Sequence, residues 1–88
     1  MKAIVSVIGK DKTGIIYHVS KALFEEGINV EDISQTILQD YFTMIMLVSL
    51  QDNASIEKIN EKLTALSKEL NVQIRIQHES IFNAMYNI

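Results

Sequence analysis

Cysteine is missing altogether from this sequence of 88 residues. Its absence excludes disulfide bonds, thiolate metal sites and a cysteine nucleophile. A chain without disulfides suits a reducing compartment, so we expect a cytoplasmic protein. No stretch approaches the roughly 20 apolar residues that a membrane-spanning helix needs, and no targeting signal follows Met1. We therefore expect a soluble protein without a membrane partner.

Positive charge is also scarce. Lysine and arginine together number 8 against 11 acidic residues, the formal net charge is −3, and no basic stripe runs along the chain. This balance argues against nucleic acid as the primary partner. Arg75 is the only arginine, so the first loop lacks the guanidinium that an acylphosphatase-like phosphate cradle needs. The sequence therefore disfavours RNA binding and phosphate hydrolysis.

Apolar residues, by contrast, are abundant for so short a chain, at 48%. A domain of this size hides only about 60–65% of its unfolded surface, so part of its apolar surface stays available to a partner. No internal repeat, low-complexity segment or linker divides the chain. We expect a single domain over residues 1–88 that associates with a second copy.

Four segments read as strands. Lys2–Ile8 and Tyr41–Leu50 carry apolar residues on both parities, which predicts central strands. Ile28–Leu38 is extended, but its inward parity changes near Glu31–Asp32, which predicts a β-bulge. Val72–Gln77 alternates between apolar and polar residues and reads as an edge strand.

Helical periodicity fills the intervals between the strands. One helix begins near Ile15 and stops at Gly27, and a second runs from Ile56 to Leu70. The expected caps are Thr13 or Asp11 for the first helix and Ser55 or Asn53 for the second, with Asn71 ending the second. Ser80–Ile88 forms a short apolar helix that should dock against another surface.

The resulting order is βαββαβ with a short C-terminal helix. Right-handed crossovers place the first and third strands in the middle and both helices on one face. This is the α+β ferredoxin-like sandwich. The apolar parity facing away from the helices, together with the C-terminal helix, leaves surface for pairing with a second copy.

The loop Gly9-Lys10-Asp11-Lys12-Thr13-Gly14 offers the most chemistry. It combines glycine flexibility, free N–H groups at a helix start and charge of both signs. Such a loop suits a small anionic or zwitterionic ligand. The same composition is typical of an ordinary strand-to-helix loop, so the loop alone does not decide between the two.

Catalysis and metal binding are weaker readings. His18 with Asp11 could act as a general acid–base pair, but a partly exposed histidine and a capping aspartate explain the same residues. A metal site would have to recruit His18, His78, Asp11 or Asp32 from scattered positions. We expect no enzyme activity, no metal and no cofactor.

Several segments together resemble a known family. The first strand leading into Gly9–Ile15, followed by Asn29–Thr36, Tyr41–Met44 and Ile81–Ile88, resembles the ACT domain, the amino-acid-sensing module of metabolic enzymes. More narrowly, the chain looks like the small stand-alone ACT-domain proteins of bacteria and archaea that are related to the repressor of the glycine-cleavage system. The likeness spans essentially the whole chain.

The resemblance implies a non-catalytic regulatory module. ACT domains pair as homodimers or higher oligomers, often into one continuous sheet, bind a small amino acid at the interface and signal to a partner protein. Asp11 matches a common ligand contact, Gly14 allows close approach, and Asn29 matches a contact often contributed by the neighbouring subunit. The expected ligand-binding residues are Asp11, Thr13, Gly14, Ile15, Asn29 and Val30.

A second function stays open. The chain could be a constitutive protein–protein adaptor that dimerises without a ligand. Tyr17 and Phe24 lie seven residues apart on a side of the first helix other than its core stripe, and with the C-terminal helix they could form such a contact surface.

Overall fold

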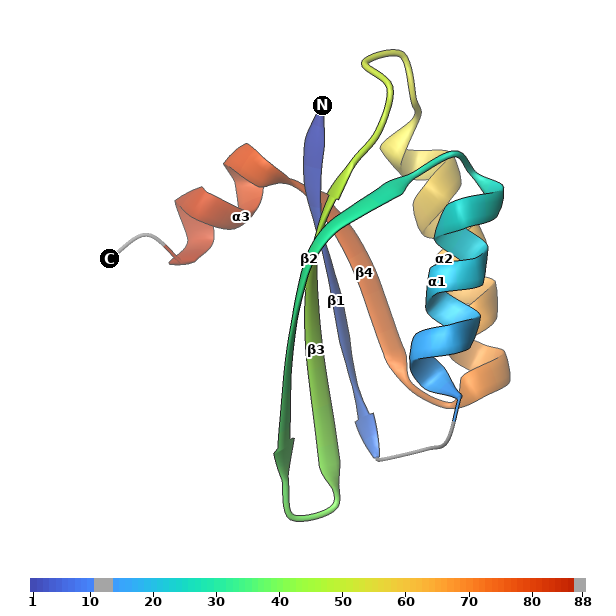
Figure 1. The fold of residues 1–88 in the computed structure, drawn as a ribbon, viewed down its shortest axis with the longest axis vertical. Coiled ribbons are helices and arrows are strands. Elements are labelled where there is room, and N and C mark those ends of the chain that lie inside the picture. Colours follow the sequence, from blue (N-terminus) through green and yellow to red (C-terminus); the bar gives the residue numbers. More distant parts are fainter. Residues whose placement is uncertain (11–13, 87–88) are drawn as a thin grey trace.

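A four-stranded antiparallel sheet carries two helices on one of its faces (Figure 1). The structure is a computed structural model that describes residues 1–10 and 14–86, apart from the side chains of residues 38, 85 and 86. Its elements, in chain order, are β1 (Lys2–Lys10), α1 (Ile15–Glu25), β2 (Asn29–Leu38), β3 (Tyr41–Ser49), α2 (Ile56–Leu70), β4 (Gln73–His78) and α3 (Glu79–Tyr86).

The sheet order is β2-β3-β1-β4, which confirms the ferredoxin-like topology with β1 and β3 in the centre. Every neighbouring pair is antiparallel. On β1, Val5 and Val7 are fully buried beneath the helices, whereas Ile8 points to the opposite face and is 48% exposed. Apolar residues on both parities therefore identified the central strands correctly.

The core lies between the sheet and the two helices. Leu23 of α1 and Leu63 of α2 belong to the same buried core as Met44 and Met46 of β3, which are fully buried. These two methionines therefore fill the centre of the core. The fully buried side chains of greatest volume are Leu23, Met44, Met46, Leu63, Ile76, Val5, Val7, Val19 and Val48.

The β-bulge predicted in the second strand is present. The register of β2 against β3 shifts between Val30 and Asp32. The Asp32 carboxylate accepts a hydrogen bond from the Ile33 N–H at 2.9 Å. The extra residue lets both Glu31 and Asp32 leave the helix-covered face.

Glycine ends α1 as expected. Gly27 has φ 71°, and its N–H donates to the Phe24 carbonyl at 3.0 Å. The Ile28 N–H donates to the Leu23 carbonyl at 3.0 Å. These two bonds form a Schellman motif, whose left-handed residue is most easily glycine.

The caps of α2 also follow the sequence prediction. The Ser55 hydroxyl accepts from the Lys58 N–H at 3.3 Å. Asn71 adopts φ 57°, and the Val72 N–H bonds to the Ser67 carbonyl at 3.0 Å. Asparagine tolerates this left-handed conformation better than most residues, so it ends the helix.

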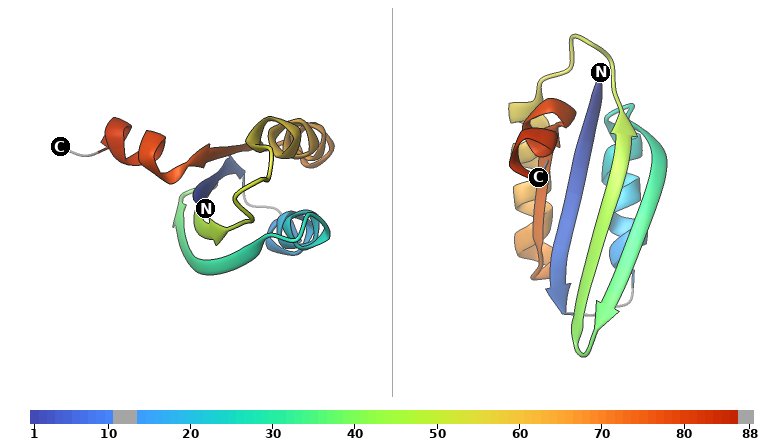
Figure 2. Two further views of the ribbon diagram at one scale, coloured as in Figure 1. Left: turned by 90° about the horizontal axis from the view of Figure 1, so that it is seen from above. Right: turned by 90° about the vertical axis from the view of Figure 1, so that its left-hand side faces the viewer.

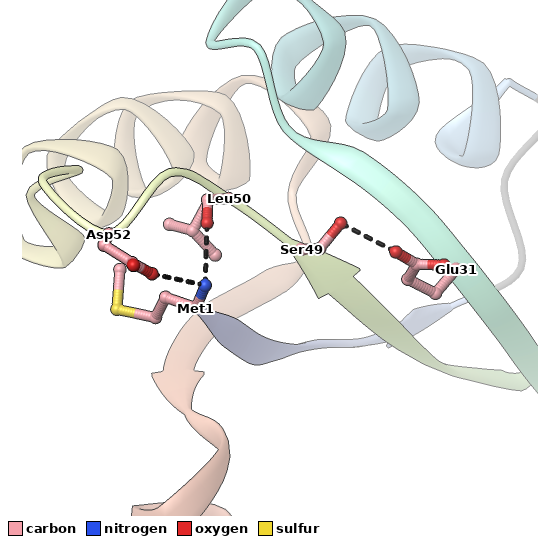
Figure 3. Close-up of polar contacts among 5 residues, drawn as sticks. All are labelled: Met1, Glu31, Ser49, Leu50 and Asp52. Carbon is pink, nitrogen blue, oxygen red and sulfur yellow. Dashed lines mark hydrogen bonds and ion pairs between the residues drawn. The ribbon is translucent and has the colours of Figure 1, made fainter.

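The start of β1 is bonded to the segment that follows β3 (Figure 3). The amino nitrogen of Met1 donates to the Leu50 carbonyl at 3.0 Å and to the Asp52 carboxylate at 2.8 Å. Hydrogen bonding and charge from this amino group lower the pKa of Asp52. The contact fixes one end of the two central strands.

The last helix, α3, projects from the sheet on the side away from α1 and α2 (Figures 1 and 2). Among the described elements it contacts only β1 and β4. Ile81 on this helix is 53% exposed. The helix is therefore present as expected, but little of it packs on its own chain.

Candidate functional site

The first helix begins at a left-handed glycine. Gly14 holds the N-cap position with φ 88°, and no described side chain caps the helix. A Cβ added at Gly14 would lie 3.6 Å from the His18 ring, an ordinary contact. The backbone conformation rather than space therefore requires glycine here, and Ile15 follows as the first helical residue. Asp11 and Thr13 lie outside the described residues, so their capping and ligand contacts stay predictions.

Gly9 has a different role from the one that its place in the predicted loop suggests. β1 continues to Lys10, and Gly9 pairs with Phe42 inside the sheet. A Cβ at Gly9 would lie 2.5 Å from Val72 Cγ1 and 3.2 Å from Val72 Cα. Assigning Gly9 to a flexible loop was wrong, because this glycine lies in β1 and permits its close packing against Val72, just before β4.

The start of β2 carries a small polar cluster. The Asn29 side-chain amide donates to the Glu31 carboxylate at 3.4 Å. The Ser49 hydroxyl donates to the same oxygen at 2.8 Å, and Figure 3 shows this second bond. The Ser49 bond, and after it the Asn29 bond, lower the pKa of Glu31. Val30, the next predicted site residue, is partly buried and packs against the core. Asn29 is thus oriented by an ionised neighbour.

The sequence interpretation missed Glu31 and Ser49: it used Glu31 only to place the β-bulge and gave neither residue a part in the site. The period of two puts Asn29 and Glu31 on one side of the strand. In the sheet, Asn29 is directly opposite Ser49. The cluster follows once the register is known, but the sequence alone does not give that register.

Within one chain, the described part of the candidate site is split. Gly14 and Ile15 stand at the beginning of α1, whereas Asn29 and Val30 come just after its end (Figure 1). The helix has 11 residues, which corresponds to a length of about 16 Å. A small ligand cannot span that separation inside one copy.

The two edges of the sheet differ. At the β4 edge, the Asn60 amide of α2 donates to the Ile76 carbonyl at 3.0 Å and accepts from the Ile76 N–H at 3.0 Å. Asn60 thereby occupies the hydrogen-bonding groups that a further strand would use there. β2 forms the opposite edge of the sheet.

A groove of about 610 Å³ lies between α2 and β4, away from the predicted ligand-binding residues. Its walls combine aliphatic side chains with Asn60, Arg75 and His78. The groove is lined by Ile56, Asn60, Thr64, Ile74, Arg75, Ile76, Gln77, His78 and Ile81. None of the predicted ligand-binding residues takes part in it.

Two kinds of feature are missing from the part of the chain that the structure describes. No helix there is long and apolar enough to cross a membrane. Nor do three or more histidine, aspartate or glutamate side chains gather into a group that could hold a metal ion. His18 is exposed and makes an edge-to-face contact with Tyr17, with ring centroids 5.2 Å apart.

Comparison with known families gives a match to the ACT domain over residues 2–77. Among curated relatives, a UPF0237 protein of Clostridium acetobutylicum is 54% identical over 89 residues and covers 100% of both chains. Another, from Methanopyrus kandleri, is 43% identical and covers 99% of this chain and 98% of the relative. The similarity extends across bacteria and archaea.

Solved structures agree with this match. An ACT domain protein from Streptococcus pneumoniae is 46% identical, covers 98% of both chains and superposes with a TM-score of 0.85. The regulatory subunit of aspartate kinase from Thermus thermophilus is 28% identical, covers 86% of this chain and 50% of its own, and has a TM-score of 0.67. A candidate glycine cleavage system transcriptional repressor shares the fold, with 21% identity, coverage of 86% and 45%, and a TM-score of 0.77.

Proposed function

This chain belongs to the UPF0237 family of ACT-domain proteins, and from that premise we propose that it is a regulatory module without catalytic activity. It binds a small amino acid at the interface of a homodimer and passes the bound state to a partner protein. The observation that carries the proposal is the separation of the predicted site residues to opposite ends of α1.

The direction of β2 supplies the missing half of the site. β2 starts near the end of α1 and runs back toward the end where α1 begins (Figure 1). If two copies pair antiparallel along β2, the β2 of the second copy begins beside the loop end of the first. Asn29 of the second copy then approaches Gly14 and Ile15 of the first.

The residues at this junction suit a zwitterion. The N–H groups at the start of α1 attract a carboxylate, and Asp11 can hold an ammonium group. Asn29 adds one donor and one acceptor, and its position is set by Glu31. This donor and acceptor set fits the common part of any amino acid.

Exposed apolar side chains support pairing along β2. Ile33 and Ile37 on this strand are 39% and 59% exposed. The β4 edge, by contrast, is closed at Ile76 by Asn60. Edge pairing of two sheets is therefore easier at β2 than at β4.

A thermal-shift screen of the 20 common amino acids tests the proposal. A ligand at about 100 times its Kd stabilises the folded state by about 2.7 kcal/mol, which raises Tm by roughly 10–20 °C for a domain of this size. Asp11→Ala and Asn29→Ala should each abolish the shift and leave the dimer intact. Asn53→Ala, an exposed asparagine outside the site, should respond like the wild type. A wild-type dimer that no amino acid stabilises would refute the proposal.

The constitutive adaptor is the second candidate, and the exposure of two aromatic residues favours it. Tyr17 and Phe24 on α1 are 62% and 80% exposed. An adaptor would tolerate Asp11→Ala and Asn29→Ala, but it would lose its protein partner on Phe24→Ala. The amino-acid sensor shows the opposite pattern, so a pull-down with these three variants separates the two functions.

A further inference from the structure

The junction between β4 and α3 has no linker. β4 ends at His78, and α3 begins at the next residue, Glu79. His78 therefore holds the N-cap position of α3, whose first N–H groups have no partner inside the helix. The Ser80 N–H donates to Nδ1 of His78 at 3.1 Å, and the Ser80 Oγ lies 2.8 Å from the same nitrogen. The imidazole thus caps the helix, in a position where serine, threonine, aspartate or asparagine is usual.

The direction of the cap bond fixes the state of the imidazole. A backbone N–H can only donate, so Nδ1 of His78 must accept and must carry no proton. The neutral ring then has its proton on Nε2. The Ser80 hydroxyl can donate or accept, so it suits either state of the ring. An imidazolium, by contrast, would turn a donor toward the Ser80 N–H and place positive charge at the partially positive end of the helix.

The helix α3 has little else to stabilise it. It contains 8 residues, whereas an isolated helix shorter than about 12–15 residues is marginal in water. Among the described elements it contacts only β1 and β4, and Ile81 is 53% exposed. Figure 1 shows α3 projecting from the end of β4, away from α1 and α2. The helix therefore depends on the cap at its first turn.

We propose that His78 makes α3 a pH-sensitive element: the first turn is capped while the imidazole is neutral and opens when the imidazole takes up a proton. Histidine is the side chain whose ordinary titration falls between about pH 5 and 8, which is therefore the range to examine. Ile81 of α3 lines the groove between α2 and β4 together with His78. Opening the first turn thus also changes one wall of this groove. The switch uses none of the residues of the proposed amino-acid site.

The charged groups around His78 leave one alternative to the imidazole. Glu79 follows it on α3, Arg75 precedes it on β4, and Lys2 on β1 is next to the residue that pairs with His78. On α2 the side chains that line the shared groove are uncharged, and the charged residues next to them are Glu57 and Glu61. Lysine and arginine cannot accept a hydrogen bond. Glu79, on the same helix as Ser80, is therefore the carboxylate whose own titration must be separated from that of His78.

NMR of the full chain tests the switch at the ring and at the helix. At about pH 8 the ring ¹⁵N shifts of His78 should show the tautomer with its proton on Nε2. Toward about pH 5 the helical ¹³Cα shifts of residues 80–84 should fall, while those of β1 and β3 stay constant. The hydrogen-exchange protection of amides 82–84 should fall by roughly 2- to 30-fold, as expected from the loss of an N-cap. A proton on Nδ1 at the higher pH, or helical shifts that do not change with pH, would overturn the proposal.

Three variants assign the response to one group. His78→Asn keeps an oxygen that accepts the same N–H but does not titrate, so α3 should be equally helical at both pH values. Glu79→Gln and His18→Gln keep the His78 imidazole and should respond like the wild type. A His78→Asn protein that still loses helix toward low pH, or a Glu79→Gln protein that no longer does, would refute the switch. No amino acid is added in these experiments, so the proposed function can fail without affecting their result.

Discussion

Asn60 provides the sharpest test of how the sheet edge is stabilised. Leucine has the same number of non-hydrogen side-chain atoms and the same branching as asparagine, but it removes two hydrogen bonds of 3.0 Å to Ile76, which is only 1% exposed. An unsatisfied buried polar group costs about 1–3 kcal/mol. Water can reach part of this edge, because Asn60 is itself partly exposed. We therefore expect Asn60→Leu to lower the free energy of unfolding by about 2–4 kcal/mol.

Urea denaturation followed by circular dichroism measures this loss. With a slope of about 1.5 kcal/mol per M, the midpoint should fall by roughly 1.3–2.7 M while the slope stays constant. Thr64→Leu, one turn further along α2, is the matched control and should stay within about 0.5 kcal/mol of the wild type. A midpoint for Asn60→Leu within experimental error of the wild type would refute the reasoning.

Asn60→Asp adds a test of the bond directions. The carboxylate can still accept from the Ile76 N–H, but it faces the Ile76 carbonyl oxygen without a proton to donate. Folding therefore raises the pKa of the introduced aspartate above its unfolded value of about 3.9. The free energy of unfolding of the variant should therefore lie nearest to that of the wild type below about pH 4, where the introduced side chain is protonated. It should fall further below the wild-type value as the pH rises through the folded pKa of this aspartate. A deficit that does not change with pH contradicts the assigned bonds.

Two further perturbations follow from the structure. Gly9→Ala places a Cβ 2.5 Å from Val72 Cγ1 and should lower the free energy of unfolding by about 1–3 kcal/mol, as measured by thermal unfolding. Gly27→Ala meets no atom within 4 Å, but its φ of 71° is strained for alanine, and it should cost about 1–2 kcal/mol. A Gly9→Ala protein as stable as the wild type would contradict the close packing. Ser49→Ala should move the pKa of Glu31 back toward its ordinary value of 4.5, as read from the side-chain carboxyl shift in NMR. Because folding lowers the pKa of Glu31, this carboxylate contributes to stability at pH values above its unfolded pKa, and the contribution is lost as the pH falls through its folded pKa. If Ser49→Ala leaves the pKa of Glu31 unchanged, the contact between the two side chains is refuted.

The fold was predictable because its signals are local. Apolar residues on both parities mark β1 and β3, a parity change marks the bulge before Asp32, and single residues such as Gly27 and Asn71 end the helices. Each of these depends on the period of a strand or on the conformation of one residue. The comparison with ACT-domain structures bears out the resulting topology.

The features that escaped prediction depend on contacts between distant segments. Glu31 meets Ser49 only through the register of β2 on β3, Asn60 reaches β4 from α2, and Gly9 is required by Val72. The direction of α3 is likewise set by where β4 ends rather than by the pattern of its own residues. The period of a helix or strand contains no information about such contacts. Gly14 and Asn29 were assigned to the ligand site from the family resemblance and not from periodicity.

Mixing two inactive variants tests the central claim most directly. Asp11→Ala and Asn29→Ala each disable both sites of a homodimer, but a heterodimer of the two regains one intact site if that site takes its loop from one copy and Asn29 from the other. After subunit exchange, calorimetry with the amino acid that shifts the wild type most should recover about one quarter of the wild-type stoichiometry. No binding on mixing would contradict the account, because it would mean that Asp11 and Asn29 act within the same chain.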